Sequence, residues 1–88
     1  MKQEQMSPQP PPLTLEALPV GAPARITTIQ GGRNLHRRLM GLGLRVGSQV
    51  EVLQHRGRGV VVACSGSRIA LGGGVAEKLR IEILPPEP

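Results

Sequence analysis

Five short runs of aliphatic and β-branched residues, separated by glycine-rich breaks, constrain the fold of this chain more than any other feature. The runs occupy residues 24–30, 49–54, 60–64, 68–71 and 79–84, and their lengths are typical of strands. Five strands in so short a chain must curl to cover both faces of a core, and closure also removes exposed sheet edges. We therefore expect a mainly β fold, a small five-stranded barrel that is closed or half open.

A short amphipathic helix is predicted after the first strand, over residues 35–42. Three leucines fall at positions i, i+4 and i+7 of one helical face: Leu35, Leu39 and Leu42. Asn34 is expected to cap the N-terminus of this helix. Gly43 is expected to end it in a left-handed conformation, so that Leu44 packs back onto the helix.

The composition excludes some partners and favours others. The chain has no Phe, Tyr or Trp, so it lacks the aromatic grooves that bind proline-rich peptides and the aromatic faces on which nucleic acid bases stack. Residues 13–84 carry ten Lys and Arg against four Glu. This positive charge favours an anionic partner; the alternative is that it only keeps a small domain soluble and monomeric.

The two ends of the chain are predicted to lie outside the folded unit. Residues 1–12 and 85–88 are rich in proline and poor in apolar side chains, so they cannot bury enough surface to offset the entropy of ordering them. We expect disordered tails there and one domain over residues 13–84. The sequence has no apolar signal segment and no run long enough to span a bilayer, so we expect a cytoplasmic protein without direct membrane insertion.

Residues that bind metals or perform catalysis are few and scattered. His36 on the helix and His55 at a strand end are weak candidates for a metal site, because neither lies at zinc-ligand spacing from another His or Cys. Cys64 ends an apolar strand and is expected in the core. The glycine runs lack a phosphate-loop pattern, and the chain has no Asp for a Ser-His-Asp triad. We expect no cofactor and no enzymatic activity.

Leu15–Val20 followed by Gly21 forms an L-x-x-L-x-x-G pattern, and residues 38–44, RLMGLGL, form an R-L-x-x-L-G-hydrophobic element. These patterns resemble the opening and the signature of the FeoA family, ferrous iron transport protein A. Gly47, Val50 and Val52 resemble its G-x-x-V-x-V strand. The positions that carry the signature here are Leu39, Leu42, Gly43, Leu44 and Gly47.

The resemblance implies an SH3-like barrel and a role beside FeoB, the membrane ferrous iron transporter that has a cytoplasmic GTPase region. We expect the chain to bind and modulate that region through Arg37, Arg38 and Met40 on the helix. The alternative for these residues is that the arginines only solvate the outer face of the barrel. We expect a monomer or a weak homo-oligomer.

A small basic barrel is also compatible with binding to nucleic acid. The Arg56–Gly59 loop, RGRG, suits a phosphate backbone, but the absence of aromatic residues for base stacking argues against this function. A related alternative is a detached metal-regulator domain, because FeoA-like domains also occur at the C-termini of iron-dependent repressors. Such repressors carry a helical DNA-binding region, of which this sequence has no sign.

Overall fold

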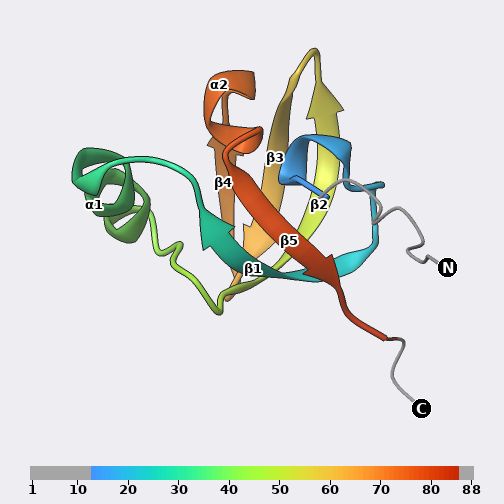
Figure 1. The fold of residues 1–88 in the computed structure, drawn as a ribbon. Coiled ribbons are helices and arrows are strands. Elements are labelled where there is room, and N and C mark those ends of the chain that lie inside the picture. The colour runs from blue at the N-terminus through green and yellow to red at the C-terminus, as the bar shows by residue number, and fades with distance from the viewer. Residues whose placement is uncertain (1–12, 86–88) are drawn as a thin grey trace, which may run out of the picture.

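The computed structural model describes residues 13–85, which form a curled β-sheet with short helices at its rim (Figure 1). The predicted tail over residues 1–12 and most of the one over 85–88 lie outside the described residues. The elements follow one another in this order: the 3₁₀ turn η1 (Leu15–Ala17), β1 (Pro23–Ile29), α1 (Arg33–Gly41), β2 (Gln49–Arg56), β3 (Gly59–Cys64), β4 (Ser67–Leu71), α2 (Gly73–Ala76) and β5 (Leu79–Ile83).

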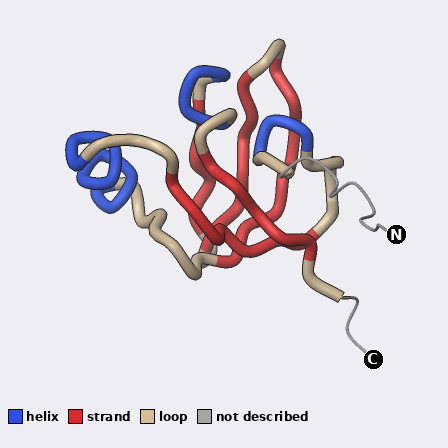
Figure 2. Tube along the Cα trace, in the orientation of Figure 1, coloured by secondary structure: helices blue, strands red, loops and turns tan. Residues whose placement is uncertain are grey.

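All five strands belong to one antiparallel sheet in the order β4-β3-β2-β1-β5. Figure 2 shows how the strands wrap around a common interior. The register shifts within the β1–β5 pair, between Ile26 and Thr28, and within the β2–β3 pair, between Val52 and Gln54. Such irregularities bend a strand and increase its twist, which lets a small sheet curl. The predicted mainly β fold, with one short helix after the first strand, is confirmed.

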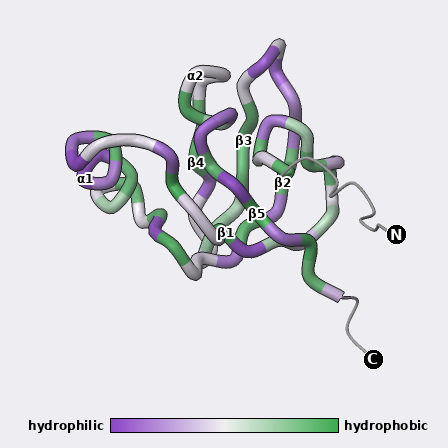
Figure 3. Tube along the Cα trace, viewed as in Figure 1, coloured by the Kyte–Doolittle hydropathy of each residue, from purple (hydrophilic) through white to green (hydrophobic). Residues whose placement is uncertain are grey.

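The core is aliphatic and receives side chains from every strand. Alternate residues point inward, most clearly in β3, where Val60, Val62 and Cys64 are buried and the residues between them are half buried. The largest fully buried side chains are Leu15, Leu18, Ile26, Leu39, Leu44, Leu79, Val52, Val60 and Val62. Figure 3 shows this apolar character along β3 and the hydrophilic character of much of α1. Among residues 13–85, no polar or charged residue is buried.

Two tight turns fix the hairpins of the sheet. Ser65 (φ 51°) and Gly66 (φ 83°) connect β3 to β4, and two successive positive φ angles match the twist of the flanking strands. The predicted runs left residues 65–67 between these two strands, but Ser67 already belongs to β4, so the turn has two residues. The expected loop from Arg56 to Gly59 is also shorter, since β2 includes Arg56 and only two residues separate it from β3.

The start of α1 differs from the prediction, whereas its end agrees. The helix begins at Arg33 with Gly32 as its N-cap, so Asn34 lies inside the first turn. The carbonyl oxygen of Gly32 accepts the first helical hydrogen bonds, which leaves no capping role for Asn34. At the other end Gly43 has φ +93°, and the Leu44 amide donates to the Leu39 carbonyl oxygen at 2.8 Å. These contacts form the predicted left-handed helix stop.

The structure contains a second short helix, α2 (Gly73–Ala76), beside the one expected after the first strand. The leucine stripe also differs from expectation. Of the three leucines on one face of α1, Leu39 is 1% exposed, but Leu42 is 49% exposed. The periodicity placed them on one face correctly, but the barrel does not extend far enough to cover the whole face.

Candidate functional site: the surface around α1

Helix α1 projects from the barrel more than any other element in the view of Figure 1. It makes no extended backbone contact with any strand or helix, and Leu39 is the residue of α1 that is fully buried. Gln30, Gly31 and Gly32 link it to β1, and the Gly43 turn leads through the buried Leu44 back toward β2. The helix is therefore held at a few points, with most of its surface in solvent.

The arginines of α1 lack acidic partners within the described part of the chain. Arg37 and Arg38 are exposed, and no carboxylate of residues 13–85 lies within 4.0 Å of either guanidinium. Arg58, in contrast, contacts Glu16 and Glu77, at 3.4 and 2.9 Å. The helix thus presents positive charge that its own fold does not neutralise, which suits an anionic surface on a partner.

The three predicted docking residues do not share one surface. Met40 lines a wide groove beside the loop that leads into β2, while Arg38 lines a small groove between α1 and the end of β4. Arg37 lines neither groove, and it is separated from Leu39 by more than a right angle around the helix axis. Helical spacing places Arg38 and Met40 on opposite sides of α1, whereas Arg37 and Met40, three residues apart, are neighbours on its surface.

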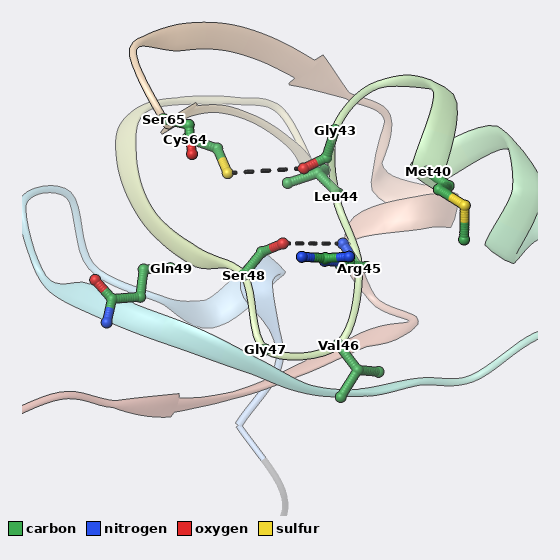
Figure 4. Close-up of a pocket in the computed structure, with 10 residues that line it drawn as sticks. All are labelled: Met40, Gly43, Leu44, Arg45, Val46, Gly47, Ser48, Gln49, Cys64 and Ser65. Carbon is green, nitrogen blue, oxygen red and sulfur yellow. Dashed lines mark hydrogen bonds between the residues drawn. The ribbon is translucent and has the colours of Figure 1, made fainter.

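The wide groove is drawn in Figure 4 and has a volume of about 960 Å³. Met40 on one wall is 64% exposed, and Val46 on the loop is 52% exposed. Hydrogen bonds fix the loop, because the Arg45 amide donates to the Ser48 hydroxyl oxygen at 3.0 Å and the Gly47 amide donates to the Ile26 carbonyl oxygen at 2.7 Å. The result is a rigid, open concavity with apolar side chains and an exposed arginine.

Two apolar residues of the surface around α1 were not predicted to contact a partner. Val46 and Leu42 are both about half exposed, a high value for large apolar side chains, and exposed apolar groups that gather in one region often mark an interface. The sequence did not indicate their exposure, because both residues lie next to glycines close to the predicted end of the helix. Only the folded position of α1 showed that nothing in residues 13–85 covers them.

The signature positions have a structural role here. Leu39 and Leu44 are buried in the core, and Gly43 and Gly47 have φ angles of +93° and +98°. Only glycine adopts such angles without strain. The signature therefore builds the turn that carries α1 away from the barrel and brings the chain back to β2.

The weak metal candidates remain apart. His36 is half buried on α1, whereas the Nε2 atom of His55 lies 2.7 Å from the carbonyl oxygen of Leu18. A carbonyl only accepts, so Nε2 must carry the hydrogen and is not free to bind a metal. Cys64 is buried, with its thiol 3.9 Å from the Gly43 carbonyl oxygen. Across the part of the chain that the structure covers, no three His, Cys, Asp or Glu residues are grouped to hold a metal ion.

The described helices are short. Among residues 13–85, none has the length and apolar character needed to cross a bilayer.

Comparison with known proteins agrees with this architecture. The family model described as the FeoA domain matches residues 13–83. The chain belongs to the FeoA family. A curated FeoA relative, "Putative Fe(2+) transport protein A" of Methanocaldococcus jannaschii, is 32% identical over 57 residues, which are 65% of this chain and 70% of the relative.

Solved FeoA structures have the same SH3-like fold. A crystal structure described as the iron uptake regulatory protein FeoA aligns with a TM-score of 0.75 and 28% identity, over 82% of this chain and 96% of that one. A FeoA protein from Chlorobium tepidum aligns with a TM-score of 0.74 and 29% identity, over 86% and 74% of the two chains. The expected fold class is thereby confirmed.

The same domain also occurs inside a longer regulator. A manganese-dependent transcriptional repressor in complex with manganese aligns with a TM-score of 0.77 and 26% identity. The alignment covers 88% of this chain but 39% of the repressor. The likeness is therefore to one part of that protein.

Proposed function

We propose that this FeoA-family protein is an accessory of ferrous iron uptake that binds the cytoplasmic GTPase region of a FeoB-type membrane transporter and modulates it. The observation that carries the proposal is the projecting helix α1, a basic element whose exposed surface the barrel neither covers nor neutralises. The family membership supplies the link to iron transport. Arg37, Arg38 and Met40 are the proposed contact residues, and because they lie around α1 rather than on one face, the partner must contact the helix from more than one side.

Charge and apolar groups have different tasks in this proposal. Arg37 and Arg38 steer the helix toward an acidic surface, an effect that acts mainly on the association rate and on specificity. Met40 supplies an adaptable apolar contact, and its high exposure (64%) leaves it available. To modulate the transporter, the protein must bind one conformation of the GTPase region more tightly than another.

The test is co-purification with the transporter from detergent-solubilised membranes. The double variant Arg37→Glu/Arg38→Glu reverses both charges without touching the buried Leu39 and is expected to lower recovery at least about tenfold, in line with the loss of close charge pairs. The matched control is Arg56→Glu/Lys78→Glu, two exposed residues outside α1 with the same change in charge. The control is expected to co-purify and to support iron uptake like the parent.

Retention of the transporter by the α1 variant would refute the assignment of this site. Equal losses in both double variants would point to net charge rather than to the helix. Adding a short DNA or RNA duplex as competitor addresses the nucleic acid alternative, because such binding falls steeply with salt. If the duplex displaces the transporter from the parent protein only at low salt, nucleic acid binds this surface through charge alone and is not its specific partner.

A further inference from the structure

The two edges of the sheet differ in how they are protected. Along β5, the Ile81 amide donates to the Leu13 carbonyl oxygen at 2.9 Å, and Thr14 forms a bridge next to it. Along β4, the register with β3 is unbroken, and the free side has no backbone hydrogen bond from any other segment of residues 13–85. A regular, uncovered strand edge is a template for another strand.

The turn before β4 determines which backbone N–H and C=O groups of this strand face the free side. The turn between β3 and β4 has two residues, so Ser67 exchanges both of its backbone hydrogen bonds with β3. Bonded and non-bonded pairs then alternate. Ile69 and Leu71 direct their backbone groups toward β3, and Arg68 and Ala70 direct theirs to the free side. Both Arg68 and Ala70 are exposed.

A small groove of about 80 Å³ lies between the end of this edge and α1. Its apolar walls come from Leu35 of α1, the C-cap residue Leu42, Ala70 of β4 and Val75 of α2, and Arg38 also lines it. The groove is smaller than the cavity of about 150 Å³ that admits benzene in a protein core. Its volume is therefore suited to one aliphatic side chain.

We propose that the free edge of β4 and this groove dock an extended acidic peptide of the partner by strand addition. The peptide backbone pairs with Arg68 and Ala70, one aliphatic side chain enters the groove, and a carboxylate contacts Arg38. An exposed edge beside a side-chain pocket is the arrangement by which strand addition combines affinity with specificity. The proposal rests on the proposed function for the identity of the partner and adds the segment class and the binding mode.

Charge decides between this occupant and a second copy of the chain. Neither Arg38 nor Arg68 has a carboxylate within 4.0 Å among the described residues. Pairing two β4 edges antiparallel would bring Arg68 of each copy close to that of the other, between molecules of net charge +5. An acidic strand instead gains from both arginines.

The first test uses a phage-displayed library of nine-residue peptides, selected against the full chain. Enriched peptides are expected to alternate aliphatic and acidic residues, as strand addition requires. A synthetic copy of the most enriched peptide is then titrated by calorimetry. Arg38→Glu is expected to weaken its binding about tenfold or more, the scale of a lost charge-assisted contact. Arg33→Glu, the matched control at another exposed arginine of α1 that does not line the groove, is expected to change it by less than about twofold.

Ala70→Pro tests the backbone contact separately. Proline removes an outward N–H without removing a β3–β4 hydrogen bond, which is the situation in which a strand edge tolerates it. The affinity of this variant for the peptide is also expected to fall about tenfold, while its far-UV circular dichroism spectrum stays unchanged. Hydrogen exchange gives a readout that needs no variant. The amides of Arg68 and Ala70 exchange fast in the free protein and become protected by the peptide, while those of Ile69 and Leu71 are slow throughout.

Three results would overturn the proposal: no enriched peptide, equal binding by the parent and Arg38→Glu, or protection that avoids Arg68 and Ala70. If Ala70→Pro does not fold, Arg38→Glu and the exchange pattern decide. Co-purification of the transporter is scored in parallel on the parent protein. Its failure alone refutes the proposed function, whereas failure of the peptide test alone refutes strand addition.

Discussion

At the scale of single residues, glycines decide where this chain can turn. Gly43 and Gly47 bracket the return from α1 to the sheet, with φ angles of +93° and +98°. Gly41, two residues before Gly43, is the last residue of α1, and a Cβ added there would meet no atom within 4 Å. Substitution by alanine is therefore expected to change the stability of the protein differently at these two kinds of glycine.

Gly43→Ala is expected to lower the free energy of unfolding by about 1–2 kcal/mol, because alanine is strained in the left-handed region. Gly41→Ala, the control in the same helix, is expected to leave stability unchanged or raise it by up to about 1 kcal/mol. Urea unfolding followed by far-UV circular dichroism measures both. Equal effects of the two variants would contradict the assigned role of Gly43.

At the scale of elements, α1 depends on one buried side chain. Leu39 is 1% exposed and Leu42 on the same face is 49% exposed. We expect Leu39→Ala to cost about 2–3 kcal/mol through lost burial and a residual cavity. Leu42→Ala, removing the same atoms from a half-exposed position, is expected to cost less than about 1 kcal/mol. Thermal and urea unfolding measure the stability of both variants. A large loss of stability in Leu42→Ala would mean that Leu42 is buried in solution.

Another element-scale contact joins the β2–β3 turn to both small helices. The guanidinium of Arg58 contacts Glu16 of η1 and Glu77 after α2. Arg58 is 74% exposed, so each pair is strongly screened and contributes at most about 1 kcal/mol. Arg58→Ala is expected to lower stability by less than about 1 kcal/mol in low salt. Arg56→Ala, next to the same turn, is the control and should cause no loss that depends on salt.

At the scale of the whole molecule, repulsion among like charges opposes folding. The net charge is +5, and the three ion pairs found among residues 13–85 involve only two of the arginines. Raising sodium chloride from 10 to 200 mM is expected to raise the melting temperature by about 2–4 °C, because screening relieves repulsion. The variant Arg37→Glu/Arg38→Glu, with a lower net charge, should respond less. A fall in melting temperature with salt would show that ion pairs dominate.

The strand positions could be predicted from the sequence because they depend on the pattern of neighbouring residues. Alternation and β-branched residues fixed the strand positions to within two residues, and Gly43 marked the end of α1 correctly. The prediction that Asn34 caps the helix was wrong because N-cap preference is only a local tendency. The helix begins one residue before Asn34, with Gly32 as its N-cap. The exposure of Leu42 had no local signal, because it depends on how far the barrel extends along α1.

The sequence alone determined which residues share a face, where the chain must turn, and that the core is aliphatic, because these properties depend on neighbours a few positions away. Only the tertiary structure decided which faces remain open. The curl of the sheet set how much of α1 the barrel covers and left the β4 edge unpaired, and both depend on contacts between segments far apart in the chain.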